Sequence, residues 1–145
     1  VRLSLAQLFL ELMRNFPAPA EDAPPSRANR GVLQALNYIN ANYTRKITLE
    51  QAAREALMNK NYFCTVFKQQ MGCTYYRYVN TLRLHYACTL LKSTERTVKE
   101  IALDCGFSDI STFNKAFRKA YGLSPGDYRR SDRPVPTYTD IKDEP

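Results

Sequence analysis

Apolar residues in the middle of the chain recur at helical spacing, and few stretches alternate as a strand would. Polar residues of the capping type precede most of these segments, and Gly72 and Gly122 follow two of them. The pattern therefore predicts an all-α fold. Its helices are expected at about residues 30–43, 49–57, 60–71, 74–92, 98–104, 110–121 and 125–130.

Two of these helices begin with a capping box, in which two side chains three residues apart bond to each other's backbone N–H groups. Thr48 has this spacing from Gln51, and Thr97 has it from Glu100. Further single caps are expected at Asn59, Asp109 and Ser124.

Residues 3–16 predict a separate amphipathic helix with one apolar face. Because about four turns of helix are marginal alone in water, this face must pack on its own domain, on a missing domain or on a second copy. Residues 17–28 (PAPAEDAPPSRA) follow as a Pro-rich, semi-rigid linker, and residues 131–145 are expected to form a flexible acidic tail. The apolar face comprises Leu5, Leu8, Phe9, Leu12, Met13 and Phe16.

The sequence repeats itself at an offset of 50 residues. Each copy has a short helix, a tight turn, and a second helix with two phenylalanines one turn apart and a glycine at its end. This is the pattern of a helix-turn-helix, with turns expected at 57–59 and 106–108. The matched pairs are Ala52/Ala102, Asn59/Asp109, Phe63/Phe113, Phe67/Phe117, Lys68/Arg118, Gly72/Gly122, Thr74/Ser124 and Tyr78/Tyr128.

The phenylalanine pairs predict which face of each second helix lies inward. The opposite faces are polar, as the solvated faces of ordinary helical hairpins would also be. A helix of this kind can enter the major groove of DNA with its N-terminal half and contact base edges. The candidates for base contact are Lys60, Asn61, Thr65, Ser111, Asn114 and Lys115, and those for backbone contact are Lys68 and Arg118.

The distribution of charge favours the nucleic-acid interpretation. The chain carries 21 basic and 14 acidic residues, a net charge of +7. Residues 30–130 hold 16 of the basic and 7 of the acidic residues, so this segment alone carries +9. Such an excess favours a polyanionic partner, with nucleic acid first and an anionic membrane second. Charge that serves only solubility is the alternative.

Composition excludes several other classes of site. The four cysteines lack zinc-ligand spacing and His85 is the single histidine, so neither a metal site nor a histidine-based triad is expected. The sequence has no Gly-rich phosphate loop and no apolar run long enough for a transmembrane helix. We therefore expect a cytoplasmic protein with free thiols, no enzymatic activity, no cofactor and no membrane partner.

Other side chains have two interpretations each. Arg83 is a candidate for DNA contact or for an ion pair with Glu50 or Asp104. Three basic residues are candidates for phosphate contact or are simply solvated: Lys92, Lys99 and Arg129. Four tyrosines could stack on bases, although core packing is favoured: Tyr75, Tyr76, Tyr78 and Tyr86.

Three motifs of the second copy carry a family resemblance. They are Ile101-Ala102 with Gly106-Phe107, then Phe113 through Lys119, then Gly122 through Arg129. They match I-A-x-x-x-G-F, F-x-x-x-F-[KR]-[KR] and G-x-[ST]-P-x-x-[YF]-R, and so the chain resembles the DNA-binding domain of the AraC/XylS family of bacterial transcription regulators over about residues 30–130. The first copy matches in Tyr62-Phe63, Phe67-Lys68, Gly72 and Arg83-Leu84.

The resemblance implies a seven-helix domain at 29–130 with helix-turn-helix subdomains at 48–72 and 97–122, joined by a long helix at 74–92. Helices 60–71 and 110–121 would enter successive major grooves of one duplex. Larger members carry a sensor domain before this one, so residues 1–16 are interpreted as its remnant and as a candidate dimerisation surface. The chain departs from the family in having Asn59 where serine is usual and Thr65 where many members have Arg or Lys.

The leading interpretation is a sequence-specific, double-stranded-DNA-binding transcriptional regulator, and most members of the family it resembles are activators. RNA polymerase is a candidate partner. The alternative is a protein-interaction module, in which residues 3–16 and the exposed helices bind RNA polymerase or a second regulator.

Overall fold

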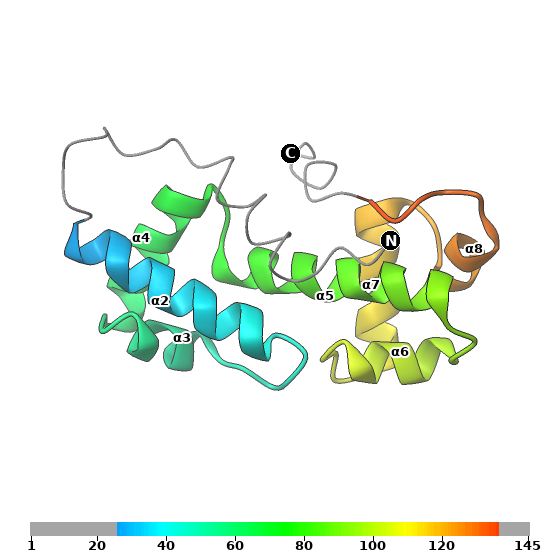
Figure 1. Ribbon diagram of the computed structural model, residues 1–145, viewed down its shortest axis with the longest axis horizontal. Helices are drawn as coiled ribbons and strands as arrows, with labels where there is room; N and C mark the ends of the chain where they lie inside the picture. Colours follow the sequence, from blue (N-terminus) through cyan, green and yellow to red (C-terminus); the bar gives the residue numbers. More distant parts are fainter. Residues whose placement is uncertain (1–25, 137–145) are drawn as a thin grey trace. The chain divides into compact units, whose positions relative to one another are not determined.

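The structure is a computed structural model that describes residues 26–136 of the chain (Figure 1). Within this range it contains seven α-helices and no strand, which confirms the predicted all-α fold. The predicted helix 3–16, most of the linker and the end of the acidic tail lie outside the described residues. The helices are α2 (Arg27–Asn42), α3 (Leu49–Glu55), α4 (Lys60–Met71), α5 (Tyr75–Ser93), α6 (Val98–Asp104), α7 (Ile110–Tyr121) and α8 (Pro125–Arg130).

The predicted capping side chains bond to the backbone at the helix starts. Thr48 Oγ1 accepts from Gln51 N at 3.2 Å, and Gln51 Oε1 accepts from Thr48 N at 2.9 Å. Thr97 and Glu100 form the same box at the start of α6. The single caps Asn59, Asp109 and Ser124 begin α4, α7 and α8, and Gly72 and Gly122 end α4 and α7.

Helix α2 begins three residues earlier than the sequence pattern predicted. Ser26 accepts two hydrogen bonds, from Asn29 N to its hydroxyl and from Arg30 N to its carbonyl oxygen, each at 3.1 Å. These bonds make Ser26 the N-cap, so Arg27 and Ala28 are helical and do not belong to the linker 17–28.

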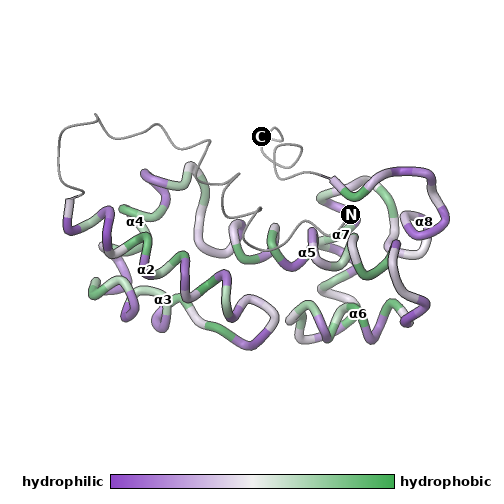
Figure 2. Tube along the Cα trace, viewed as in Figure 1, coloured by the Kyte–Doolittle hydropathy of each residue, from purple (hydrophilic) through white to green (hydrophobic). Residues whose placement is uncertain are grey.

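The chain divides by its contacts into two compact units, and the described part of the first comprises residues 26–42 and 47–78. Helices α2, α3 and α4 pack on one another in this unit (Figure 1). Figure 2 shows both hydrophobic and hydrophilic residues along α2, as is typical of an amphipathic helix. The core holds an aromatic cluster whose neighbouring ring centroids lie 5.3–6.5 Å apart: Phe63, Phe67, Tyr75 and Tyr78.

The described part of the second unit comprises residues 43–46 and 79–136. Its core is built around Phe117, whose ring centroid lies 4.7 Å from that of Tyr121 and 5.5 Å from that of Tyr128. Cys88 and Cys105 are fully buried in the same core, and neither forms a disulfide. Burial raises the pKa of Cys105 to about 12 and that of Cys88 to about 11. These two cysteines therefore act as small core residues.

Residues 131–136, the first part of the predicted flexible tail, are bound to the second unit. The hydroxyl of Tyr128 donates to the carbonyl oxygen of Pro134 at 2.9 Å. Arg133 donates to the carbonyl oxygen of Tyr121 at 3.0 Å, and Val135 packs against the core. Tertiary contacts therefore extend the ordered domain past residue 130.

The two helix-turn-helix segments do not correspond at one uniform offset. The capping boxes relate α3 to α6 at an offset of 49, since Thr48 corresponds to Thr97. The single caps relate α4 to α7 at an offset of 50. The pairing of Ala52 with Ala102 is therefore wrong, and Ala53 is the true counterpart of Ala102.

The second turn is thus one residue longer than the first. Leu57 and Gly106 occupy the same position in their turns, directly after the C-cap, and both have left-handed backbones with φ of 56° and 97°. Each donates its backbone N–H to a carbonyl three residues earlier. The extra residue lies between Gly106 and the N-cap Asp109. The phenylalanines follow this residue and keep an offset of 50, so they alone do not reveal that α3 and α6 are related by an offset of 49.

Candidate nucleic-acid interface

Helix α4 presents a polar outer face because its apolar residues are used for packing. Phe63 and Phe67 are fully buried, as their spacing predicts. All four candidates on this helix are exposed: Lys60, Asn61, Thr65 and Lys68. Gln69 is exposed on the same face, and sequence reasoning missed it. Its spacing of four from Thr65 and eight from Asn61 was the available signal.

Two of the candidates on α4 have intramolecular partners. Lys60 Nζ lies 2.7 Å from Glu50 Oε1 on α3. A side-chain hydrogen bond to Lys60 lowers the pKa of Glu50, and the same bond raises the pKa of Lys60. Thr65 Oγ1 donates to the carbonyl oxygen of Asn61 at 3.2 Å, so its hydroxyl is left to act as an acceptor.

Helix α7 is built in the same way, with Phe113 and Phe117 fully buried. The candidates Ser111, Asn114, Lys115 and Arg118 are all exposed. Lys119 is exposed four residues after Lys115 and was also missed by sequence reasoning. The helix contains three basic residues and no acidic one. Its exposed surface therefore combines hydrogen-bonding side chains with positive charge, which suits a groove lined by phosphates.

The carboxylate of Asp109 caps the N-terminus of α7. This carboxylate accepts from Thr112 N at 2.7 Å, from Thr112 Oγ1 at 2.9 Å and from Ser108 Oγ at 3.1 Å. The hydrogen bonds from Thr112, backbone first, hold the pKa of Asp109 below its usual range. Asp109 therefore stabilises the start of the helix and is itself acceptor-only.

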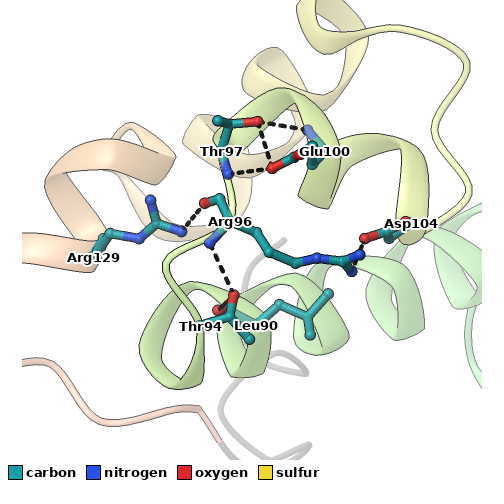
Figure 3. Close-up of polar contacts among 7 residues, drawn as sticks. All are labelled: Leu90, Thr94, Arg96, Thr97, Glu100, Asp104 and Arg129. Atoms are coloured by element: carbon teal, nitrogen blue, oxygen red, sulfur yellow. Dashed lines mark hydrogen bonds and ion pairs between the residues drawn. The ribbon is translucent and has the colours of Figure 1, made fainter.

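A polar network supports α6, the helix on which α7 packs (Figure 3). Arg96 pairs with Asp104 at the end of α6. Arg129 on α8 donates to the backbone carbonyl oxygen of Arg96. The N-cap Thr97 follows directly and forms its box with Glu100. This network holds both ends of α6.

Three basic residues that were candidates for DNA contact have structural partners instead. Arg83 donates from Nε to Tyr43 O at 2.7 Å and also to Arg45 O, whereas the ion pairs of Glu50 and Asp104 are made with Lys60 and Arg96. Lys92 donates to Ser131 O and lies over the Tyr128 ring, 4.8 Å from its centroid. Arg129 is half-buried and donates to two carbonyl groups, while Lys99 is exposed.

The tyrosine candidates divide between core and surface. Tyr75 and Tyr78 are buried, and Tyr78 donates to Asn40 Oδ1 at 3.0 Å. Tyr86 is half-buried with its ring against that of Tyr43. Tyr76 is 63% exposed. The interpretation as core residues is therefore confirmed for three of the four tyrosines.

The part of the chain that the structure describes contains neither a metal-holding group of side chains nor a membrane-spanning helix. No group of three or more histidine, cysteine or acidic residues there could hold a metal ion. None of the helices between residues 26 and 136 combines the length and hydropathy that crossing a bilayer requires.

Comparison with known proteins identifies the family to which the chain is similar. A family described as a helix-turn-helix domain matches residues 26–131. The probable transcriptional regulator LumQ of Photobacterium leiognathi is 37% identical over 93 residues, which cover 64% of this chain and 38% of LumQ. The transcriptional activator RhaR of Klebsiella pneumoniae is 33% identical over 132 residues, which cover 90% of this chain and 46% of RhaR. The chain thus spans less than half the length of these relatives.

Solved structures show the same fold. The C-terminal domain of AraT, a response regulator from Geobacillus stearothermophilus, superimposes with a TM-score of 0.69 at 34% identity, covering 81% of this chain and 98% of that one. The DNA-binding domain of AdpA, solved in complex with a target DNA, superimposes with a TM-score of 0.66 at 25% identity, covering 69% and 90%.

Proposed function

The chain belongs to the AraC-type helix-turn-helix family of DNA-binding transcriptional regulators, and we propose that it binds specific sequences of double-stranded DNA through α4 and α7. One observation carries the proposal. Each of these helices buries two phenylalanines completely and leaves the opposite face exposed and polar. Side chains on such a face can reach base edges when the helix lies in a major groove.

Base contact is assigned to outward side chains in the N-terminal halves of the two helices. Asn, Ser, Thr and Lys side chains all form hydrogen bonds with base edges in the major groove. Two basic residues farther along, Lys68 and Arg118, are assigned to the phosphate backbone. The residues assigned to base contact are Lys60, Asn61, Thr65, Ser111, Asn114 and Lys115.

We further propose that the two helices enter successive major grooves. Helix α5 has 19 residues and so spans roughly 28 Å at 1.5 Å per residue. Half-sites read by paired helix-turn-helix elements lie about one helical turn apart, roughly 34 Å. A connecting helix of this length supports a site with two such half-sites.

The role of an activator is proposed from the names of two relatives. RhaR is named as an activator, and the lactose operon regulator of Staphylococcus xylosus, 29% identical over 125 residues, is also named as one. We propose that this chain belongs to an activator that contacts RNA polymerase in the bacterial cytoplasm. Residues 3–16 are proposed as its dimerisation surface.

Selection from a random library of duplexes, followed by footprinting, tests the proposal. The chain should enrich one sequence and protect two regions about one helical turn apart, and its affinity should fall steeply with salt because lysine and arginine displace counterions. Failure to retard any duplex would favour the alternative, a protein-interaction module. Affinity that does not depend on salt would contradict the assigned backbone contacts.

A further inference from the structure

The ion pair between Glu50 and Lys60 joins the two helices of the first helix-turn-helix. Glu50 lies in the first turn of α3 and Lys60 is the first residue of α4. Their charged atoms lie 2.7 Å apart, although both side chains are more than half exposed, at 56% and 53%. The carboxylate thus lies beside an ammonium group that is assigned to DNA.

The helices do not depend on this pair to form. Helix α3 is capped by Thr48 and Gln51, and α4 is capped by Asn59, whose side chain accepts from Tyr62 N at 2.9 Å. Neither charged side chain contributes to the buried core. Exposed pairs of this kind contribute little to stability. Stability therefore does not explain why Glu50 lies beside Lys60.

The second helix-turn-helix lacks the pair. With the register set by the caps, the position of Glu50 is occupied by Lys99 and the position of Lys60 by Ile110. The pair therefore belongs to the first element alone and is not a requirement of the helix-turn-helix geometry.

We propose that Glu50 is an affinity-limiting residue, which holds Lys60 in the free protein and competes with DNA for it. This inference rests on the proposed function of α4. On arbitrary DNA, a solvated phosphate only replaces the carboxylate, so Lys60 gains little by leaving it. On the preferred sequence, Lys60 gains base-edge acceptors such as the O6 and N7 atoms of guanine. Contact of Lys60 with either duplex costs the bond to Glu50, and this cost is complete on the preferred sequence, where Lys60 leaves the carboxylate. Glu50 thus weakens binding to both duplexes, and to the preferred sequence at least as much as to arbitrary DNA.

A double-mutant cycle in the 145-residue chain tests this. The variants are Glu50→Gln, Lys60→Gln and their combination, and affinity is measured on the duplex selected from the library and on a scrambled duplex over a series of KCl concentrations. Glu50→Gln should bind the scrambled duplex up to about fivefold more tightly. Its salt dependence there should be steeper by about one ion, because Lys60 is then free to meet a phosphate. The selected duplex should gain at least as much, because Lys60 leaves the carboxylate completely when it contacts the bases.

Glu55→Gln is the matched control, since Glu55 is an exposed acid on the same helix. It removes the same charge without releasing Lys60, so it should reproduce neither change. In the Lys60→Gln background, Glu50→Gln should have no further effect. Circular dichroism should show all variants folded, because the exchanged side chains are exposed.

Two results would overturn the role of Glu50. One is an equal gain from Glu50→Gln with and without Lys60, which would mean general repulsion between the carboxylate and DNA. The other is an equal gain from Glu55→Gln. Failure of the unmodified chain to bind any duplex is a separate outcome, because it would reject the proposed function itself and the inference with it.

Discussion

The guanidinium group of Arg129, on α8, donates a hydrogen bond to the backbone carbonyl oxygen of Arg96, the residue before the N-cap of α6 (Figure 3). Its Nε also donates to the carbonyl oxygen of Leu91 on α5, at 3.2 Å. One side chain therefore ties α8 to the last turn of α5 and to the segment that precedes α6. Because α7 packs on α6, Arg129 supports the candidate interface without belonging to it.

Replacement of Arg129 should destabilise the second unit. Arg129→Ala leaves two carbonyl groups without a charged donor, and we expect a loss of about 2 kcal/mol in the free energy of unfolding, measured by urea denaturation. Arg130→Ala is the control, since that side chain is exposed and pairs only with Asp127 three residues earlier. Equal losses in the two variants would show that the bonds of Arg129 contribute nothing specific.

Gly106→Ala should be poorly tolerated. A Cβ at this position would lie 2.8 Å from the backbone oxygen of Tyr43 and 2.9 Å from Nε of Arg83, and its φ is 97°. We expect a loss of at least about 2 kcal/mol in the free energy of unfolding, measured by thermal denaturation. Gly126→Ala, where a Cβ would meet open space at an ordinary φ, should be close to neutral. A small effect of Gly106→Ala would contradict the close approach of the segment 43–46.

Leu57→Gly should stabilise the first unit. Leu57 is 78% exposed and has a φ of 56°, so its side chain adds little packing and its backbone is strained. The glycine should raise the free energy of unfolding by about 0.5 kcal/mol, the relief of strain less the entropy that glycine loses. Leu57→Ala removes the side chain and keeps the strain, so it should not stabilise. A gain from alanine equal to that from glycine would reject the backbone explanation.

The stability that Asp109 contributes should depend on pH. Folding lowers the pKa of Asp109 from its ordinary value of 3.8. The charged carboxylate therefore contributes its full stabilisation above pH 3.8, and this stabilisation is lost as the pH falls through the lower pKa of the folded protein. Asp109→Asn keeps the cap without the charge. The unmodified chain should be more stable than this variant at pH 7, and the difference should close below about pH 3.8. A difference that stays constant down to pH 2 would contradict the role of the charge.

Lys115→Ala should relax the preference at particular base pairs in a repeated library selection. The expected cost is about 1–3 kcal/mol at those positions, the value of one good base contact. Lys46→Ala removes an exposed lysine outside α4 and α7 and should leave the preference unchanged. A uniform loss across all sequences would instead assign Lys115 to the phosphate backbone.

Several roles were decided by residues distant in the sequence. Arg83 binds carbonyl groups of the segment 43–46, about 40 residues before it, and Lys92 binds Ser131, 39 residues after it. A basic residue has the same local pattern whether it meets a phosphate or a carbonyl group. The sequence therefore left both interpretations of these residues open.

Local signals determined the helices, their caps, the buried phenylalanines and the exposure of all eight candidate residues, because each depends on neighbours within a few positions. Only the tertiary structure decided the register of α3 against α6, the pairing of Lys60 with Glu50 and the support of α6 by Arg129. The physical reason is that these contacts form between elements. Their geometry depends on how helices cross and on the length of a turn, which hydrophobic periodicity does not encode.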